Sequence, residues 1–286
     1  MYAWYEHSAE CYVRLNDYKG SIESLGECEW FSRGWTLQEM LAPKLVVFFT
    51  ADWEVIGHKS LSPMRQPSAL RTRGPSIVTE LSKVTGVPEL YLDNLPVDEA
   101  SIAERMSWAA GRETTRGEDR AYSLLGLFKV HMPLLYGEGS KAFIRLQEEI
   151  MRRSDDDSIL CHGHHNILAR TPFDFRESGE IVAGPMRAAV EPYEMTNRGL
   201  KLHVKARLLP MPHEHTRYKE EIYRIELGCH KLDEKSIARY KRIPQFLYVQ
   251  RFGHVVLKYQ DYPSYLVKNE VRSWGNETTQ MFYVTL

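Results

Sequence analysis

The spacing of apolar residues changes near residue 160, and this change constrains the fold more than any other feature of the sequence. Before it, apolar residues recur at helical spacing, as in Phe143, Leu146 and Ile150. After it they alternate with polar residues, which is the pattern of strands with one buried face. We therefore predict a mixed α/β domain over residues 1–160 and a mostly antiparallel β-rich domain over residues 161–286.

The α/β part combines predicted helices with short strands. Residues 32–41 form an expected helix with Ser32 near its N-cap, and an apolar strand over 45–49 follows after a short link. An alternating strand is expected over 11–15, and residues 57–76, rich in Pro, Ser, Arg and Gly, form an expected loop. Helix followed by strand with short links favours parallel strands covered by helices.

Composition and charge narrow the functional classes. The 286 residues are 43% hydrophobic and 26% charged, and the formal net charge is -1. A nearly neutral chain has no overall field that attracts nucleic acid, so we expect no nucleic-acid partner. We expect no membrane span, because no apolar run is long enough, and no signal peptide. Four cysteines without CxxC spacing favour reduced thiols in a cytoplasmic protein.

Three blocks of sequence carry a resemblance to a known family. The first, residues 30–43, is WFSRGWTLQEMLAP. The second, residues 103–126, contains AERMSWAA, RETTR and EDRAYSLLG. The third, residues 132–149, contains MPLLYGEG, KAF and RLQEE. In this order the blocks closely resemble the heterokaryon-incompatibility (HET) domain of fungi, and TNRGL at 196–200 looks like the domain that often follows it.

The resemblance implies a role in self/non-self recognition. In the family the HET domain triggers the programmed cell death that follows fusion of genetically unlike hyphae, an innate-immunity-like response, and it often sits beside nucleotide-binding and repeat modules. This chain contains no GxxxxGK[ST] phosphate-binding loop, so the resemblance implies control by a partner or by an upstream segment. Other incompatibility proteins, or a second copy of the chain, are the implied partners.

The family also leads us to expect sequence upstream of Met1. HET domains usually begin earlier, with strands that include a motif near Ser-His-Thr-Trp, so this chain resembles the C-terminal part of the domain. An α/β sheet without those strands exposes an open edge with unpaired backbone groups. Two interpretations follow: the protein starts upstream, or it is a partial, inactive copy.

Glu39 is the candidate catalytic residue, on the helix predicted over 32–41. Helical spacing puts it on one face with Ser32, Trp35 and Thr36, opposite the apolar side chains. The pattern looks like the Ser-Arg-Trp-x-x-x-Glu helix of Toll/interleukin-receptor (TIR) domains, to which HET domains are thought to be distantly similar. In enzymatic TIR proteins the glutamate at that place supports cleavage of NAD between nicotinamide and ribose.

This second resemblance assigns roles to four side chains. Glu39 would stabilise the oxocarbenium-like charge that builds up on the ribose as nicotinamide leaves. Ser32, Arg33 and Trp35 would bind the ligand, with Trp35 stacked on a flat ring. The alternative is structural: Glu39 pairs with Arg33 or Lys44, and Trp35 belongs to the core.

Arginines of the second block form another candidate ligand site. Arg112, Arg116 and Arg120 fall at i, i+4 and i+8, so one continuous helix would present them in a row that can hold phosphates. Arg112 and Arg116 are the ligand-binding candidates. Gly117 favours a break instead, and the same charges then form ion pairs and caps that join two helices.

Two further clusters have simpler interpretations. The run CHGHH at 161–165 offers zinc or copper ligands, and Cys229 and His230 could add a pair only if the fold brought them near. An interdomain linker with incidental histidines is favoured, and no metal site is predicted. The glycines of YGEG at 136–139 permit a left-handed turn before a helix that starts near residue 140.

The sequence leaves three functional hypotheses. The first is a signalling module of incompatibility that acts through assembly with other HET-type proteins. The second is a TIR-like NAD glycohydrolase that depends on Glu39, with NAD as its substrate and no bound cofactor. The third is a truncated, inactive HET paralogue with an incomplete sheet, which predicts poor solubility and non-cooperative unfolding.

Overall fold

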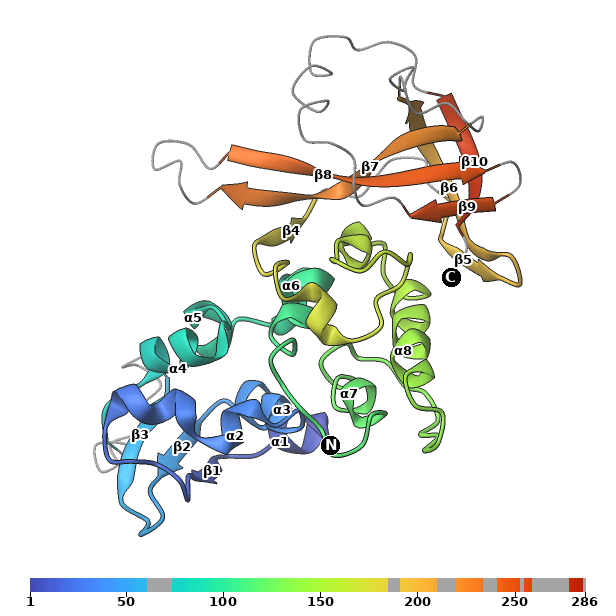
Figure 1. The fold of residues 1–286 in the computed structure, drawn as a ribbon. Coiled ribbons are helices and arrows are strands. Elements are labelled where there is room, and N and C mark those ends of the chain that lie inside the picture. The colour runs from blue at the N-terminus through green and yellow to red at the C-terminus, as the bar shows by residue number, and fades with distance from the viewer. Residues whose placement is uncertain are drawn as a thin grey trace. The chain divides into compact units, whose positions relative to one another are not determined.

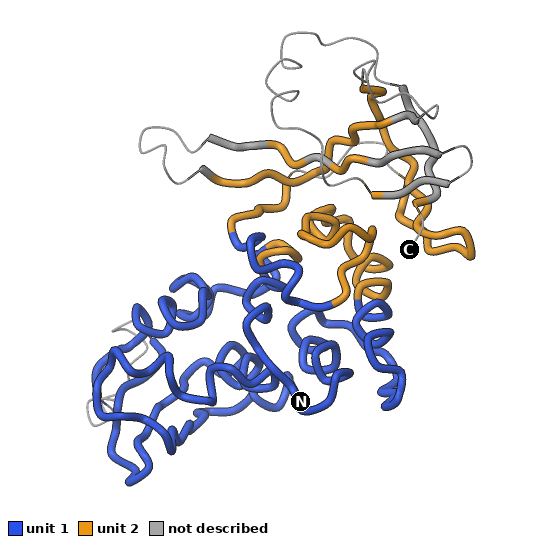
Figure 2. Tube along the Cα trace, viewed as in Figure 1, with its two compact units in different colours: residues 1–100, 105–146, 171–179 blue, residues 101–104, 147–170, 180–286 orange. Residues whose placement is uncertain are grey.

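The chain divides into two compact units (Figure 2). The computed structural model describes residues 1–60, 74–184, 191–209, 220–233, 241–252, 255–258 and 278–284. Unit 1 comprises residues 1–100, 105–146 and 171–179, and unit 2 comprises residues 101–104, 147–170 and 180–286. The chain therefore passes between the two units more than once, which a single boundary near residue 160 does not capture.

Unit 1 is built on a three-stranded sheet with the order β1-β2-β3 (Figure 1). Strand β1 (Cys11–Arg14) lies parallel to β2 (Val46–Phe49), which confirms the predicted parallel pair. Strand β3 (Val55–Lys59) lies antiparallel to β2, so the sheet is mixed. The class of the fold, a mixed α/β unit with parallel strands, is thus as predicted.

Strand β3 corrects part of the loop expected over 57–76. Gly57, His58 and Lys59 continue the pairing with β2 and belong to the sheet, because their backbones complete its ladder. Gly57 suits this place, since a Cβ there would lie 2.6 Å from a methyl carbon of Ile77 and 2.7 Å from the Pro75 carbonyl oxygen. Residues 61–73 of the expected loop lie outside the described part of the chain.

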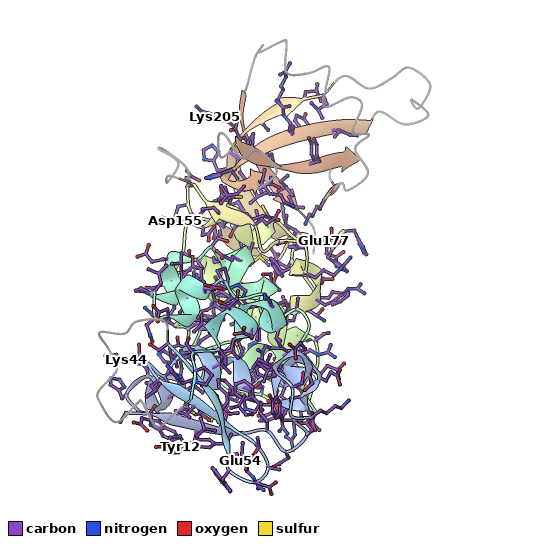
Figure 3. The ribbon with its side chains drawn as sticks, turned by 90° about the vertical axis from the view of Figure 1, so that its left-hand side faces the viewer. Tyr12, Lys44, Glu54, Asp155, Glu177 and Lys205 are labelled. Atoms are coloured by element: carbon purple, nitrogen blue, oxygen red, sulfur yellow. The ribbon has the colours of Figure 1, made fainter. Side chains whose placement is uncertain are left out.

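The sheet buries one face by simple alternation. On β1 and just beyond it, Val13 and Leu15 are buried, whereas Tyr12 points outward (Figure 3) and is 57% exposed. The rings of α2 (Glu29–Ser32) cover β2, with the centroids of Trp30 and Phe48 5.6 Å apart. Burial of these rings ties the first sequence block to the sheet.

The remaining helical elements follow in chain order. They are α1 (Tyr2–Glu6), η1 (Ile22–Glu27), α3 (Thr36–Leu41), α4 (Val78–Thr85), α5 (Glu89–Leu92), η4 (Val97–Glu99), α6 (Ile102–Ser107), α7 (Asp119–Tyr122), α8 (Lys141–Met151), η5 (Asp157–Leu160) and η6 (Pro172–Phe175). The helix predicted from the apolar periodicity of Phe143, Leu146 and Ile150 is confirmed as α8.

Unit 2 is dominated by a largely antiparallel sheet with the order β4-β7-β8-β9-β10-β6-β5. Its strands are β4 (Ile181–Ala183), β5 (Glu194–Thr196), β6 (Gly199–Leu208), β7 (Glu220–Asp233), β8 (Lys241–Phe252), β9 (Val255–Lys258) and β10 (Thr278–Val284). An additional pairing of β6 with β7 closes a ring of five strands, which leaves β4 and β5 as attachments. The predicted antiparallel β-rich part is confirmed.

Strand β6 shows the alternation that the sequence predicted. Leu202, Val204 and Ala206 are buried, while Lys205 is exposed and extends outward (Figure 3). A strand with one buried face places every second side chain in the core.

Among the residues that the structure describes, no helix is long and apolar enough to cross a membrane.

Candidate functional site

The segment that carries Glu39 is two short helices and not the single helix predicted over 32–41. Helix α2 ends at Ser32, and α3 begins at Thr36. Between them the backbone of Glu113 intervenes: its N–H donates to the Ser32 carbonyl oxygen at 2.6 Å, and its carbonyl oxygen accepts from the Gly34 N–H at 2.7 Å. These long-range bonds replace helical ones, so Ser32 is the last residue of α2 and not an N-cap.

Gly34 permits this insertion. A Cβ at this position would lie 2.5 Å from the Thr114 Cγ2 atom, a distance that real side chains do not tolerate. The neighbouring Arg33 has an extended backbone, with φ -78° and ψ 137°, and forms an isolated parallel bridge with Glu113. The first two sequence blocks are therefore joined through backbone hydrogen bonds at this glycine.

The break also changes which side chains share a face. Thr36, expected on the polar face with Glu39, is buried, and its hydroxyl donates to the carbonyl oxygens of Trp30 at 2.6 Å and Arg33 at 2.7 Å. Ser32 is exposed and Trp35 is half-buried. The predicted common face of Ser32 with Thr36 is thus wrong, because the two residues belong to different helices.

Glu39 lies half-buried on α3 beside the N-terminal residues of the chain. Burial, followed by the charge of Glu39 and a hydrogen bond with its carboxylate, raises the pKa of Tyr5 to about 12. Burial and the same carboxylate also raise the pKa of Cys11. Arg33, one of the two cations considered as a partner of Glu39, lies 3.8 Å from the Glu29 carboxylate. The charge of Glu39 therefore acts on a tyrosine and a thiol.

A buried lysine holds the C-terminal end of α3. The Nζ atom of Lys59 donates to the carbonyl oxygens of Met40 at 2.8 Å and Pro43 at 2.7 Å, and the side chain is completely buried. Helix C-terminal carbonyls have no partner within the helix and carry partial negative charge, so an ammonium suits this position. Burial nevertheless lowers the pKa of Lys59 to about 7. Sequence reasoning missed this residue, because an expected loop gave no reason to bury it.

The three arginines of the second candidate site are separated by the structure. Residues 112 and 116 lie outside any helix, and α7 begins at Asp119, after the break that Gly117 favoured. Arg112 donates to the Arg33 carbonyl oxygen and to the Thr36 Oγ1 atom, each at 2.9 Å. Burial lowers the pKa of Arg112 to about 10. Its role in the structure is to fix the break between α2 and α3.

Arg116 and Arg120 have different surroundings. The Arg116 guanidinium lies 4.6 Å from the ring centroid of Tyr136, where it makes a cation–π contact. Arg120 is exposed and lines a pocket of about 410 Å³ in unit 1. The row of three arginines predicted for one continuous helix is therefore not formed, because the chain turns between the residues.

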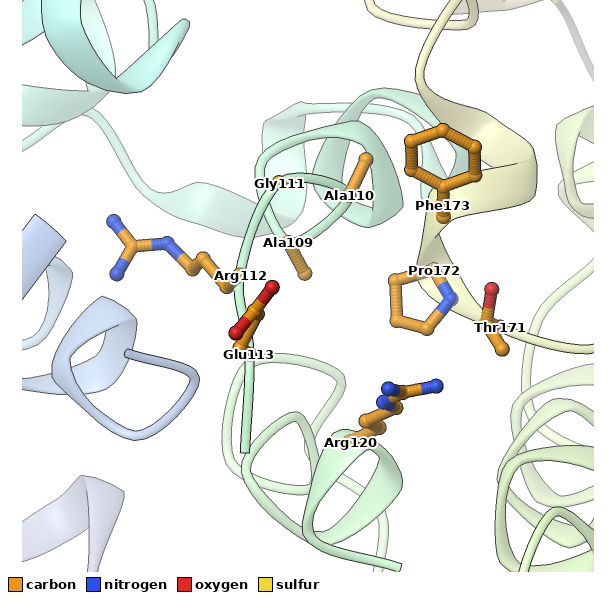
Figure 4. Close-up of a pocket in the computed structure, with 9 residues that line it drawn as sticks. All are labelled: Ala109, Ala110, Gly111, Arg112, Glu113, Arg120, Thr171, Pro172 and Phe173. Atoms are coloured by element: carbon orange, nitrogen blue, oxygen red, sulfur yellow. The ribbon is translucent and has the colours of Figure 1, made fainter. Parts of the chain in front are cut away.

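The pocket combines charge with apolar surface. It is lined by Ala109, Ala110, Gly111, Arg112, Glu113, Arg120, Thr171, Pro172 and Phe173. Figure 4 shows the Arg120 guanidinium beneath Pro172, whereas the Arg112 side chain extends to the opposite side, away from Phe173. A guanidinium, a carboxylate and an aromatic ring around one hollow can hold a small molecule that carries both charge and a flat surface.

The third sequence block is clamped to α7 by two carboxylates. The Glu118 Oε1 atom accepts from the N–H groups of Gly137 at 2.8 Å and Gly139 at 3.0 Å, and these hydrogen bonds lower the pKa of Glu118. Both glycines have positive φ, 105° and 59°, which confirms the predicted left-handed turn. The structure thus uses Glu118 to bind this glycine turn.

Tyr122 and Arg145 complete the clamp around Glu138. The Tyr122 hydroxyl donates to the Glu138 Oε1 atom at 2.8 Å and accepts from the Leu135 N–H at 2.7 Å. Arg145 donates to the same carboxylate and to the Pro133 carbonyl oxygen at 2.8 Å. The hydrogen bond from Arg145 is the main reason that the pKa of Glu138 is lowered. The EDRAY and YGEG motifs therefore have a structural explanation.

The CHGHH run lies in unit 2 and is held by the backbone. The His162 Nε2 atom lies 3.1 Å from the Ile167 carbonyl oxygen, and burial and the nearby Lys258 ammonium lower the pKa of His162 well below 6.5. The ring is therefore neutral at physiological pH. Among the described residues, no group of three or more His, Cys, Asp or Glu side chains is arranged to hold a metal ion.

The parts of the three sequence blocks that belong to unit 1 thus interlock through hydrogen bonds. The chain is similar in sequence to a fungal vegetative incompatibility protein, which bears out the predicted resemblance. It is 39% identical, over 172 residues and 56% of its own length, to the vegetative incompatibility protein HET-E-1 of Podospora anserina. The chain spans 11% of the length of that relative. No family model and no solved structure matches the chain.

Proposed function

We propose that this chain acts in vegetative incompatibility, as a non-self recognition module whose engagement triggers cell death in a fungal cytoplasm. The observation that carries the proposal is the 39% identity with a protein named for that process. Because the chain spans only 11% of this relative, the proposal concerns a module and not the relative's whole activity. The module would act by assembling with other incompatibility proteins or with a second copy of itself.

The interlocked blocks of unit 1 support a role in assembly. The motifs that resemble the family serve largely to fix loops: Gly34 accommodates the Glu113 backbone, and Glu118 binds the turn at Gly137. A rigid surface built from such loops suits recognition of a partner, since preformed surfaces lose less conformational entropy on binding.

The proposal is tested by inducible expression of the chain in a filamentous fungus. Growth arrest and uptake of a membrane-impermeant dye are expected in cells that express the wild-type chain. The test variant is Glu118→Ala. It removes the carboxylate that binds the glycine turn, and it is expected to reduce growth arrest and dye uptake. A folded, abundant wild-type chain that leaves growth unchanged in every host tested would refute the proposal.

Cleavage of NAD by a TIR-like unit is the second candidate function. Its support is the half-exposed carboxylate of Glu39 on a short helix that follows the Ser-Arg-Gly-Trp sequence. Against it, Ser32 belongs to a different helix from Glu39, Thr36 is buried, and the described pocket is lined by other residues. Growth arrest that Glu39→Gln abolishes together with loss of cellular NAD would establish this candidate. Growth arrest that persists in Glu39→Gln with unchanged NAD favours assembly.

The inactive-paralogue hypothesis is separated from both by unfolding behaviour. It predicts a broad, non-cooperative transition, because an incomplete sheet exposes unpaired strand edges. A sharp calorimetric transition of the purified chain would argue against it.

A further inference from the structure

Two cysteines that are far apart in sequence meet in unit 2. Cys161 caps the C-terminal end of η5 and Cys229 lies on β7, and their sulfur atoms are 3.3 Å apart. None of the four cysteines is disulfide-bonded in the structure. A disulfide requires about 2.05 Å between its sulfurs, so a shift of roughly 1 Å brings the pair to bonding distance.

The backbone on both sides of the pair is anchored, which holds the sulfurs at this distance. The Asp157 carboxylate of η5 accepts from the Gly228 N–H and from the Tyr193 hydroxyl, each at 2.5 Å. Cys229 pairs with Ala183 of β4, next to an irregular stretch in the pairing of β7 with β8. Such irregularities redirect side chains out of the regular pleat. A bond between the sulfurs therefore needs side-chain rotation and little backbone movement.

The two thiols differ in how easily a reagent reaches them. Cys229 is 3% exposed, and its hydrogen bond with Cys161, burial and the nearby Asp157 raise its pKa, so it holds its proton at neutral pH. Cys161 is half-exposed and can be reached by a small reagent. The Lys258 Nζ atom lies 3.2 Å from the carbonyl oxygens of Leu160 and His162, the residues on either side of Cys161. Cys161 is accordingly the thiol that an oxidant meets first.

We propose that Cys161 and Cys229 form a reversible disulfide by exchange with a low-molecular-weight disulfide such as oxidised glutathione. The Cys161 thiolate attacks one sulfur of the reagent, which forms a mixed disulfide and releases one thiolate. Cys229 then gives up its proton and attacks the Cys161 sulfur, which releases the second thiolate. Two protein thiols are oxidised, and one reagent disulfide is reduced to two thiols.

The bond would tie η5 to β7 across 68 positions of sequence. Closing so long a loop restricts the unfolded chain, so the oxidised form of unit 2 is expected to be the more stable form. This makes the pair a redox-controlled staple, and it is independent of the function proposed above.

The test uses the full chain incubated with oxidised glutathione and then analysed by intact mass and non-reducing peptide mapping. We expect a product that has lost two hydrogen atoms, with a cross-linked peptide pair containing Cys161 and Cys229. Its thermal midpoint should rise by several degrees, and dithiothreitol should reverse both changes. The matched control, Cys11→Ser with Cys28→Ser, should form the same cross-link.

Single variants test the order of the steps. Cys229→Ser should stop at one glutathione adduct on Cys161, whereas Cys161→Ser should form no intramolecular bond. The proposal is overturned if the wild-type chain keeps all four thiols under oxidising conditions, or if the cross-link joins Cys11 to Cys28. The peptide map of the wild-type chain decides this without either variant, so misfolding of a variant does not leave the result open.

Discussion

Removing one hydroxyl group, in Tyr122→Phe, tests whether the clamp of unit 1 stabilises the fold. The Tyr122 ring is 1% exposed, and its hydroxyl both donates to Glu138 at 2.8 Å and accepts from the Leu135 N–H at 2.7 Å. In the variant, the Leu135 N–H and the Glu138 Oε1 atom lose the hydrogen bond that each makes with the Tyr122 hydroxyl. Because Leu135 itself is 53% exposed, water can replace part of what is lost.

These contacts set the expected magnitude. A lost hydrogen bond that leaves a partly buried group unsatisfied costs about 1–2 kcal/mol of unfolding free energy. For a chain of this size that corresponds to a fall of about 2–8 °C in the thermal midpoint. Scanning calorimetry of both proteins at the same pH and concentration measures the difference.

Tyr136→Phe is the matched control, because it removes the same atom from a neighbouring tyrosine. The Tyr136 ring packs edge-on against Tyr122, but its hydroxyl makes an exposed hydrogen bond to Asp119 at 3.0 Å. No resolvable shift of the midpoint is expected from this control. Equal losses in the two variants, or an unchanged midpoint in Tyr122→Phe, would show that the clamp is not what stabilises this region.

Two further predictions concern other buried polar groups. The pKa of Lys59 is about 7 in the folded protein and 10.5 ordinarily, so above pH 7 the unfolded chain binds more protons and the unfolding free energy rises with pH. That rise, at most about 1.4 kcal/mol per pH unit, should be absent from Lys59→Met in denaturant titrations between pH 7 and 8.5; identical slopes would contradict it. In unit 2, the side-chain amide of buried Gln147 makes two hydrogen bonds with the backbone of buried Ala169. Its Nε2 atom donates to the Ala169 carbonyl oxygen at 2.8 Å, and its Oε1 atom accepts from the Ala169 N–H at 2.9 Å. Gln147→Leu should therefore lower the unfolding free energy by about 2–4 kcal/mol, and a decrease below about 1 kcal/mol would contradict this expectation.

The spacing of apolar residues identified those helices and strands whose conformation depends on residues that are close in sequence. Helix α8 was predicted from Phe143, Leu146 and Ile150, all three of which are buried. Strand β6 was predicted from its alternation: Leu202, Val204 and Ala206 are buried as expected, whereas Leu208 at the end of the strand is 52% exposed. In both cases one face of the element is buried, and the spacing of its apolar residues can be recognised within a short stretch of sequence.

The segment 32–41 shows where this reasoning fails. Its composition favours one helix, but the backbone of Glu113 supplies hydrogen bonds that interrupt it after Ser32. Arg112, 76 positions away from Thr36, then bonds its hydroxyl and fixes the break. Local propensity is a matter of tenths of a kcal/mol per residue, so a few long-range hydrogen bonds outweigh it. Ser32 was thereby separated from Glu39, the residue proposed as catalytic.

The sequence by itself determined the resemblance to incompatibility proteins, the mixed α/β and antiparallel classes of the two parts, and the glycine turn at 136–139. Those features follow from ordered motifs, apolar spacing and the conformational freedom of glycine, all of which are local. Only the tertiary structure decided that Glu118 binds the turn at Gly137, that Lys59 holds the end of α3, and that Cys161 meets Cys229. Each of these contacts joins residues that are remote in the chain, and their proximity depends on how whole elements pack, which no local pattern encodes.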